Sequence, residues 1–339
     1  MSILVCGGAG YIGSHTCVEL IQAGYDIIVA DNLSNSSEES LRRVEKITGK
    51  AVSFIKMDLC DADATEALFA SHPDITAVIH FAGLKAVGES LRDPLKYYTN
   101  NLITTLNILN AMQRHGIKDF VFSSSATVYG DSASVPIRED FPTGGAINPY
   151  GRSKTYNENI LKDYCAADPT LNVALLRYFN PIGAHESGLL GEDPSGIPNN
   201  LVPYIAEVAV GRLEKLHVFG DDYPTPDGTG VRDYIHVVDL AKGHVAVLKK
   251  LKENCGLFIC NLGTGKGYSV FDVLHAYEKA CGKTLPYVVD PRRPGDTAEC
   301  YTDPKKALEE MGWEAQLGIE EMCASSWKWQ SMNPDGYPD

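Results

Sequence analysis

The stretch SILVCGGAGYIGSH, residues 2–15, decides the fold. A short apolar run, typical of a buried strand, leads into Gly7, Gly10 and Gly13, and a helical pattern follows. Glycines in this position let the backbone approach a pyrophosphate at the amino end of the helix. A second apolar run, DIIVADN at residues 26–32, ends in Asp31, whose carboxylate would bond a ribose diol and repel a 2′-phosphate. The pattern therefore predicts a dinucleotide site that prefers NAD to NADP.

Similar apolar runs recur along the first half of the chain and alternate with helical patterns. The runs are VSFIKMD (52–58), TAVIHFAG (76–83), DFVFSSS (119–125) and NVALLRYFN (172–180). Apolar strands that alternate with helices predict an α/β fold with a doubly wound parallel sheet of the Rossmann type. Loops rich in Gly, Pro and Asp follow. We expect an NAD-binding Rossmann domain over residues 1–180 and a smaller, loop-rich substrate domain over 181–339, with some segments returning to the first.

One helical pattern carries apolar residues at three- and four-residue steps, which fits a buried face. Its apolar positions are Leu95, Tyr98, Leu102, Leu106, Leu109 and Met112. Spacing alone does not distinguish a face turned to the core from one that meets another subunit.

Composition excludes several classes of partner. The 339 residues carry a formal net charge of -14 without a basic stretch, which argues against nucleic acid but leaves room for a small anion held by local arginines. No apolar run approaches the ~20 residues that a membrane span needs, so no membrane partner is expected. The nine cysteines lack CxxC or Cys/His spacing, which predicts reduced thiols in the cytoplasm and no metal site.

The segment NPYGRSK, residues 148–154, suggests the catalytic group. It places Tyr150 and Lys154 four residues apart, on one face of a helix. A nearby ammonium favours the phenolate of a tyrosine, so this pair can provide a base, although a surface cation–π pair has the same spacing. Upstream, FSSSATVYG ends a strand with three serines, of which Ser125 can bind a substrate hydroxyl. Backbone bonding is the better interpretation for Ser123 and an equal one for Ser124.

Together these residues resemble the extended short-chain dehydrogenases/reductases. The segments HFAGLKAVGES, SSSATVYG, NPYGRSK, LLRYFNPIGAH, GIPNNLVPYI and DGTGVRDYIHVVDLA resemble the UDP-glucose 4-epimerase family over essentially the whole chain. The resemblance implies that Tyr150 removes the proton of the sugar 4′-hydroxyl while the C4′ hydride passes to NAD⁺. Lys154 would bond the nicotinamide ribose and lower the pKa of Tyr150, and Ser125 would bind the hydroxyl. The ketose would then rotate and take the hydride back on its other face, so NAD is expected to stay tightly bound.

The resemblance also implies the binding residues. Asp58, after the third apolar run, is expected near the adenine edge, although it also fits a solvated loop carboxylate. The other positions that match NAD contacts are Tyr11, Ile12, Asn32, Asn35, Ser36, Leu59, Phe81, Ala82, Gly83, Lys85, Asn100 and Tyr178. Those that match contacts to uridine diphosphate are Asn180, Asn200, Leu201, Phe219, Arg232, Arg293 and Asp296. The two arginines suit bidentate oxyanion contacts, whereas surface salt bridges are the alternative for either one alone.

The segment RRPGDTAECYTD, residues 292–303, bears on the range of sugars. Its two arginines and Pro-Gly suggest a turn that holds an anion, and Cys300 matches a family position that is tyrosine in relatives restricted to UDP-glucose and UDP-galactose. A small residue there would leave room for an acetamido group, so UDP-GlcNAc and UDP-GalNAc are expected as further substrates. A register slip of one residue would place Tyr301 at this position instead, and a cysteine that merely fills the core is the other alternative.

Other functions remain open on the same fold. Nucleotide-sugar 4,6-dehydratases carry an Asp-Glu pair just before VYG, where this chain has Ala126 and Thr127. A simple NAD-dependent sugar dehydrogenase would release its cofactor. A non-catalytic NAD-binding regulator has no need of Tyr150 and Lys154 together with the diphosphate residues. The family resemblance further implies a homodimer formed through the helix around residues 95–115 and the helix that starts near Tyr150.

Overall fold

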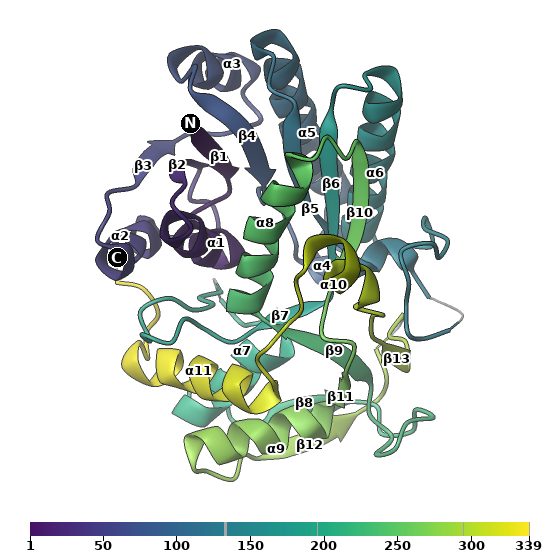
Figure 1. Ribbon diagram of the computed structural model, residues 1–339. Coiled ribbons are helices and arrows are strands. Elements are labelled where there is room, and N and C mark those ends of the chain that lie inside the picture. Colours follow the sequence, from purple (N-terminus) through teal and green to yellow (C-terminus); the bar gives the residue numbers. More distant parts are fainter. Residues whose placement is uncertain (132–133, 195, 294, 339) are drawn as a thin grey trace.

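The larger of the two lobes of the molecule is built on a parallel sheet (Figure 1). The computed structural model describes residues 1–131, 134–194, 196–293 and 295–338. Seven parallel strands run in the order β10-β6-β5-β4-β1-β2-β3. They are β1 (Ser2–Cys6), β2 (Asp26–Asp31), β3 (Ser53–Lys56), β4 (Ile75–His80), β5 (Asp119–Ser125), β6 (Asn172–Tyr178) and β10 (Leu257–Leu262). The predicted α/β fold with a doubly wound sheet is therefore confirmed.

Helices cover both faces of this sheet (Figure 1) and enclose two hydrophobic clusters. One face carries α1 (Tyr11–Gln22), α2 (Glu38–Thr48) and α8 (Val237–Leu251); the other carries α3 (Ala62–Ser71), α5 (Pro94–His115) and α6 (Pro149–Ala167). The short α4 (Val87–Arg92) packs on α5 and α6, and α10 (Lys305–Met311) packs on α8 and β10. Within the described residues, none of the helices combines the length and hydrophobicity that a bilayer crossing requires.

Local sequence explains where the helices of this lobe begin. The side chains of Ser37, Asp61, Asp93 and Asn148 each accept a hydrogen bond from a backbone N–H in the first turn of α2, α3, α5 and α6, respectively. Prolines open both α5 and α6, where a missing backbone N–H costs nothing. The cap on α6 fixes its start immediately before Tyr150, so the helix presents that residue at the edge of the sheet.

Part of the apolar repeat on α5 faces the core and part of it faces outward, and the spacing alone did not distinguish these two environments. Leu109 and Met112 are buried, but Leu95 is 74% exposed and Leu106 is 42% exposed. The residues of α5 that are turned inward are Tyr97, Asn101, Thr104, Thr105, Ile108, Leu109, Ala111 and Met112. Several of these are polar and satisfied by hydrogen bonds within the subunit, so hydrophobicity alone does not mark the side of α5 that faces the core.

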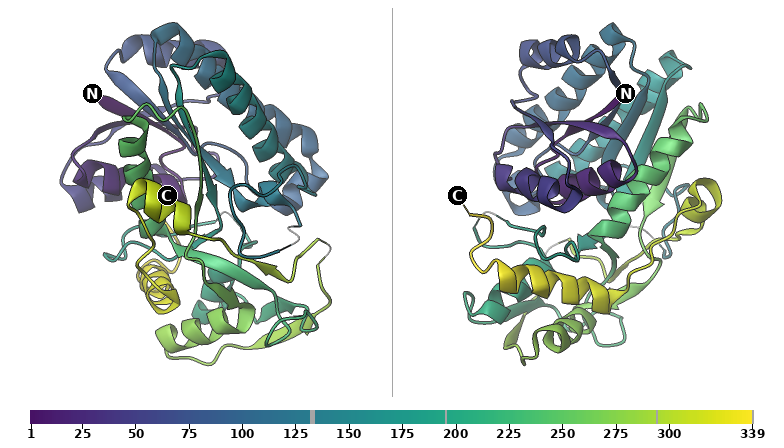
Figure 2. Two further views of the ribbon diagram at one scale, coloured as in Figure 1. Left: turned by 45° about the vertical axis from the view of Figure 1, so that its right-hand side comes forward. Right: turned by 60° about the vertical axis from the view of Figure 1, so that its left-hand side comes forward.

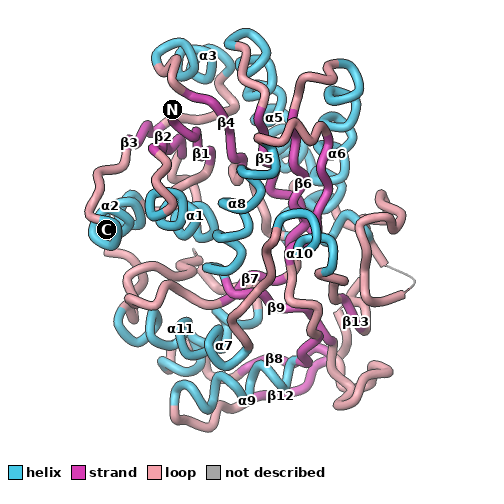
Figure 3. The backbone as a smooth tube through the Cα atoms, viewed as in Figure 1, coloured by secondary structure: helices cyan, strands magenta, loops and turns pink. Residues whose placement is uncertain are grey.

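The smaller lobe is built around β9 (Val231–His236), and loops form much of it (Figures 2 and 3). The first half of β9 pairs with antiparallel β11 (Gly267–Ser269) and parallel β13 (Glu299–Cys300), and its second half pairs with β7 (Asn180–Ile182). Strands β8 (Leu216–Phe219) and β12 (Tyr287–Asp290) form a separate parallel pair. The helices of this lobe are α7 (Leu201–Val210), α9 (Val270–Cys281) and α11 (Ile319–Met332). We propose a domain boundary near residue 180, with α8 and β10 returning to the first domain.

Candidate active site

Residues that the sequence predicts for the site gather at one edge of the seven-stranded sheet. The chain reverses its winding at β1, which lies between β4 and β2, and ligands of open α/β sheets bind outside the carboxyl ends of strands at such a point. At or within two residues of the carboxyl ends of β1 to β6 lie, in strand order, Gly7, Asp31, Asp58, Phe81, Ser125 and Tyr178. The fold thus brings these six residues to a common edge.

The glycine turn after β1 fits a dinucleotide. Gly7 has φ of +79°, and a Cβ there would lie 2.6 Å from the backbone nitrogen of Ala82. A Cβ on Gly13 would lie 2.3 Å from the carbonyl oxygen of Gly7, so this residue permits close packing of α1 on the turn. A Cβ on Gly10, which precedes α1, would lie no closer than 3.4 Å to a surrounding protein atom, and no side chain caps the helix at this position. The open amino end of α1 is therefore suited to a pyrophosphate.

Asp31 is held in one orientation at the end of β2. One carboxylate oxygen accepts a hydrogen bond from the backbone nitrogen of Ala9 (3.0 Å). The other accepts from the nitrogen of Leu33 (2.9 Å) and the hydroxyl of Ser36 (3.0 Å). The carboxylate is buried but keeps unused lone pairs, so the turn residues fix it for a ribose diol. Ser36 thus supports Asp31, while Asn32 and Asn35 lie exposed in the same loop.

The carboxyl ends of β4 and β6 meet at a buried histidine. The Nδ1 of His244 contacts the carbonyl oxygen of Leu240, so Nδ1 carries the proton and Nε2 accepts from the hydroxyl of Tyr178. Burial lowers the pKa of His244 to about 4, which keeps the ring neutral. The ring of Phe81 lies 4.8 Å from that of His244. Phe81 and Tyr178, both expected at the cofactor, are therefore positioned by one residue of α8.

The remaining cofactor-side residues lie in the turns around this edge. Leu59 is buried, Asp58 is exposed and accepts a hydrogen bond from the nitrogen of Cys60, and Asn100 donates to Asn101. The side chain of Asn101 closes the turn after β4 through the backbone of Leu84, next to Gly83. The hydroxyl of Tyr11 donates to the carbonyl oxygen of Gly183 (2.6 Å), and Ile12 and Ala82 pack against the two core clusters.

Tyr150 and Lys154 lie on α6 beside the serine strand end. Lys154 is buried, and its Nζ donates to the carbonyl oxygen of Ser123 (2.6 Å) and lies 4.9 Å from the ring centre of Phe122. Burial lowers the pKa of Lys154 to about 8. Burial also raises the pKa of Tyr150, and the Ser125 hydroxyl and the Lys85 ammonium act in the opposite direction. The site therefore has two groups, Ser125 and Lys85, that favour the phenolate of Tyr150.

Beneath these residues lies a buried ion pair that the sequence did not suggest. Glu158, one turn beyond Lys154, accepts hydrogen bonds from the Ser124 hydroxyl (2.7 Å) and from two nitrogens of Arg177 (2.8 and 2.7 Å). Burial alone would raise the pKa of Glu158, but the Arg177 guanidinium holds it below its ordinary value. Arg177 also donates to the hydroxyl of Tyr129 (2.8 Å). Ser124 therefore bonds a buried carboxylate rather than nearby backbone, and α6 is joined to β5 and β6 under the site.

The smaller lobe carries the residues expected to bind the diphosphate. Arg232 on β9 donates to the carbonyl oxygen of Val231, and in the described part of the chain no carboxylate forms an ion pair with it. The guanidinium carbon of Arg293 lies 4.7 Å from the ring centre of Phe219, and its Nε donates to Asp296 (3.0 Å). Both arginines lower the pKa of Tyr234, which burial raises. An unpaired arginine in a chain of net charge -14 is suited to an oxyanion.

Other residues of this lobe are placed less distinctively. Asn180, at the start of β7, is exposed. Asn200 and Leu201 stand at the start of α7, and the amide of Asn200 donates to Glu192 (3.2 Å). The Pro-Gly turn expected after Arg293 includes Pro294, which lies outside the described residues, so the structure does not address that part of the prediction.

Cys300 and Tyr301 lie on different sides of the chain. Cys300 pairs in register with Arg232 and packs against a cluster formed by Val128, Tyr129, Ile137 and Phe179, of which the first three lie in the segment after Ser125. Tyr301 faces β11, where a Cβ on Gly267 would lie 3.3 Å from its ring. The small side chain, and not the ring, is therefore the one next to the segment that follows the serine strand end.

Two further residues escaped the sequence interpretation. Glu158 continues the series 150, 154, 158 on one helical face, so helical spacing could have pointed to it. Glu192 forms an ion pair with Lys85 (Nζ to Oε1, 3.1 Å) and accepts a hydrogen bond from Asn200. It therefore bridges residues expected on the cofactor and diphosphate sides. No local sequence pattern marks a glutamate that bridges distant segments, so no signal in the sequence points to Glu192.

Comparison with known proteins agrees with this geometry. A doubly wound sheet with a glycine turn, Asp31 and a Tyr/Lys helix defines a nucleotide-dependent enzyme class, and the model of the NAD dependent epimerase/dehydratase family matches residues 3–263. The chain belongs to this family, and its resemblance to the UDP-glucose 4-epimerases is confirmed. The UDP-glucose 4-epimerase of Bacillus subtilis is 62% identical over 337 residues, which are 99% of each chain.

Solved structures extend the comparison. The UDP-glucose 4-epimerase from Bifidobacterium longum, in complex with NAD⁺ and UDP, is 57% identical with a TM-score of 0.95 and covers 99% of this chain and 100% of that one. The UDP-Glc/GlcNAc 4-epimerase from Campylobacter jejuni is 38% identical with a TM-score of 0.85 and covers 98% of this chain and 99% of that one.

Proposed function

We propose that this protein interconverts UDP-glucose and UDP-galactose by transient oxidation at C4′, with NAD bound throughout. The observation that carries the proposal is the position of Tyr150: it lies beside Ser125 and Lys85, at the sheet edge where the glycine turn and Asp31 fit NAD. The NAD⁺ and UDP bound by the Bifidobacterium longum relative support it.

Each residue of the site has a distinct part in this reaction. Tyr150 takes the proton of the 4′-hydroxyl, and Ser125, which donates to the phenolate oxygen, binds the same hydroxyl and stabilises the negative charge. Lys154, on the same face of α6, is placed for the nicotinamide ribose, and Lys85 adds positive charge near the phenolate. Bound NAD⁺ supplies the acceptor and then the donor of the C4′ hydride. Tyr150 returns its proton when the epimeric hydroxyl forms.

The residues that bind the diphosphate allow the ketose to rotate in the site between the two hydride steps. Arg232 and Arg293 with Phe219 provide two guanidinium groups and an aromatic face, so they bind UDP firmly and leave the hexose with few partners. A firm hold on the nucleotide with a loose hold on the sugar lets either face of C4′ approach the hydride. Asn180, Asn200, Leu201 and Asp296 complete the proposed UDP site.

A second candidate substrate pair is UDP-GlcNAc and UDP-GalNAc. Cys300 packs next to the segment that follows Ser125, and it favours this proposal because a larger side chain there would take up more of the volume that an acetamido group needs. The Campylobacter jejuni relative, named a UDP-Glc/GlcNAc 4-epimerase, supports such a range within the fold.

A homodimer in the cytoplasm is proposed as the working form. The outer side of α5 exposes Leu95, Ile103 and Leu106, and α6 beside it exposes Tyr156, whose ring lies 5.9 Å from that of Tyr98. An exposed apolar surface across two adjacent helices supports burial against a second copy. Nine free thiols support a reducing compartment.

The experiment that tests the function is an assay of the purified protein with four UDP-sugars: glucose, galactose and their N-acetyl-2-amino counterparts. Interconversion within each pair is expected. A 4,6-dehydratase would release water and give a 4-keto-6-deoxy sugar instead, and a non-catalytic regulator would convert none of the four.

A further inference from the structure

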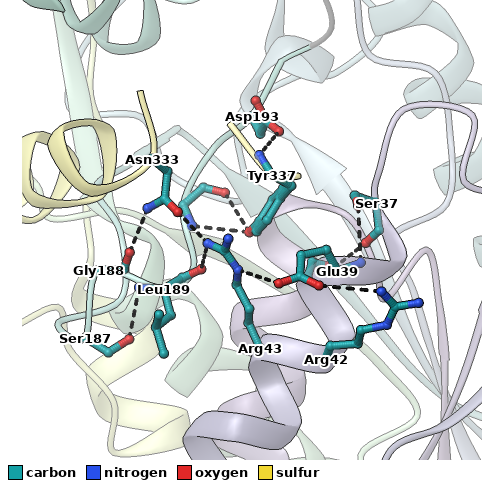
Figure 4. Close-up of polar contacts among 12 residues, drawn as sticks. Ser37, Glu39, Arg42, Arg43, Ser187, Gly188, Leu189, Asp193, Asn333 and Tyr337 are labelled. Atoms are coloured by element: carbon teal, nitrogen blue, oxygen red, sulfur yellow. Dashed lines mark hydrogen bonds and ion pairs between the residues drawn. The ribbon is translucent and has the colours of Figure 1, made fainter. Parts of the chain in front are cut away.

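A mostly buried arginine joins the two lobes at a distance from the reacting groups. Arg43 on α2 donates to the carbonyl oxygen of Leu189 (3.0 Å) and to the Oδ1 of Asn333 (2.6 Å), as Figure 4 shows. Its guanidinium carbon lies 5.5 Å from the ring centre of Trp329 and 4.9 Å from that of Tyr337. Its one carboxylate partner in the described residues is Glu39 (3.0 Å). Arg43 therefore touches α2, the segment before α7 and the C-terminal segment at once.

The neighbouring arginine shows how unusual this placement is. Arg42 has a side chain that is 65% exposed, and its ion-pair partners among the described residues, Glu38 and Glu39, are on its own helix, whereas the side chain of Arg43 is 12% exposed. Pairs within a helix at the surface contribute little to stability. A desolvated guanidinium that meets two carbonyl-type oxygens and two aromatic faces contributes much more. Arg42 and Arg43 thus form a matched pair for comparison.

The contacts around Arg43 immobilise residues 188–193. The amide of Asn333 donates to the carbonyl oxygen of Gly188 (3.0 Å), and the indole of Trp329 donates to that of Glu192 (3.1 Å). The backbone nitrogen of Tyr337 donates to Asp193 (2.8 Å). A Cβ on Gly191 would lie 2.2 Å from the Trp329 ring, so the segment packs directly on α11. The rings that hold this segment are the same ones over which the Arg43 guanidinium lies.

The immobilised segment ends at the proposed binding site. Glu192 pairs with Lys85 and accepts a hydrogen bond from Asn200, and these two residues lie on the proposed cofactor and diphosphate sides, respectively. Seven residues after Asp193 the chain reaches Asn200 and the start of α7. Loss of Arg43 would free residues 188–193, and UDP binding would then have to order them, which costs conformational entropy.

We propose that Arg43 is a positioning residue for the UDP-sugar. It fixes residues 188–193, which include Glu192, and through Glu192 it fixes Asn200. This inference rests on the proposed function, because it takes UDP as the nucleotide bound by the smaller lobe. Arg43 touches neither substrate nor cofactor in this account. Its effect is therefore expected on nucleotide affinity and not on the chemical steps.

The test compares Arg43→Ala, Arg43→Lys and the control Arg42→Ala in the full-length holoenzyme. UDP affinity is measured by calorimetry, KM and kcat with UDP-galactose by coupled assay, and thermal stability by melting. For Arg43→Ala we expect the Kd for UDP and the KM to rise about 5- to 20-fold while kcat changes by less than about threefold. Arg43→Lys keeps a cation over the rings and should show a smaller rise, and Arg42→Ala should match the unaltered protein.

A second variant keeps the inference testable if Arg43→Ala fails to fold. Asn333→Ala removes the bonds to Arg43 and Gly188 without altering α2, and it too should weaken UDP binding while sparing kcat. A lower melting temperature with unchanged Kd for UDP, or an equal fall in kcat and kcat/KM, would overturn the positioning role. Absence of UDP binding by the unaltered protein would instead contradict the proposed function, and the role of Arg43 with it.

Discussion

At the scale of single residues, the proposed reaction depends on the hydroxyl of Tyr150. Tyr150→Phe removes the proton acceptor and keeps the ring, so folding and NAD content should persist. Epimerisation of UDP-galactose should fall by at least the ~10²-fold typical of a lost general base. The measurement is kcat under saturating substrate, with circular dichroism as the control for folding. Turnover within a fewfold of the unaltered protein would place the base elsewhere.

Ser125 gives a prediction about pH. Burial raises the pKa of Tyr150, and the Ser125 hydroxyl opposes that rise because it bonds the phenolate. Ser125→Ala removes the opposing bond, so the pKa of Tyr150 should rise further. The base is active when deprotonated, and the ascending limb of kcat/KM against pH should therefore move to higher pH. Ser125→Thr, which keeps a hydroxyl, should move it less; a limb that stays in place, or moves to lower pH, in Ser125→Ala would refute this coupling.

Cys300 sets the expected range of sugars. Extra bulk in a filled site costs ~1–3 kcal/mol, or about 5- to 150-fold in affinity. Cys300→Tyr should suppress turnover of UDP-GlcNAc and UDP-GalNAc by that order and spare UDP-galactose, whereas Cys300→Ser, which keeps the size, should retain all substrates. The role would be rejected if the unaltered protein ignores N-acetylated sugars, or if the tyrosine variant converts them normally.

At the scale of elements, α5 and α6 carry the proposed contact between subunits. Leu95→Glu places a charge on a side chain that is 74% exposed in the subunit, so it should leave the fold intact and disfavour the dimer. Light scattering after gel filtration should show a shift toward monomer. Leu308→Glu on α10, at a side chain that is 48% exposed, is the control and should not change the mass. An unaltered mass in Leu95→Glu would argue against this surface.

The elements also show what sequence reasoning can and cannot reach. Six of the seven strands of the large sheet, all except β10, were predicted, because helices cover both faces and the strands are largely apolar runs. The turn at Gly7 and the face shared by Tyr150 and Lys154 were predictable because their geometry is local. The buried side of α5 was not, since Asn101 and Thr105 replace apolar residues there and are satisfied by hydrogen bonds within the subunit.

Contacts between residues that are far apart in the chain could not be predicted from local sequence patterns. The contact of Arg43 with Asn333 spans 290 residues, and that of Lys85 with Glu192 spans 107. Neither arises from a helix or strand period, so only the folded chain reveals them. The same holds for His244 of α8, which meets Tyr178 at the end of β6.

At the scale of the whole molecule, a two-lobed protein of net charge -14 places four positively charged side chains at the proposed site. Lys85 and Lys154 lie on the proposed cofactor side, and Arg232 and Arg293 on the proposed diphosphate side. In the proposed reaction the hydride leaves C4′ and returns to it within one turnover, so no net oxidation or reduction occurs. The proposed cofactor therefore has no reason to exchange with the solvent.

The most direct measurement follows from that closed cycle. Freshly purified protein, passed through gel filtration, is given UDP-galactose with no added NAD, and UDP-glucose and NADH are followed. The account predicts that UDP-glucose forms to equilibrium, that NADH does not accumulate, and that denaturation releases about one NAD per chain. Activity that requires free NAD and accumulates NADH in proportion to the sugar converted would contradict it and indicate a dehydrogenase.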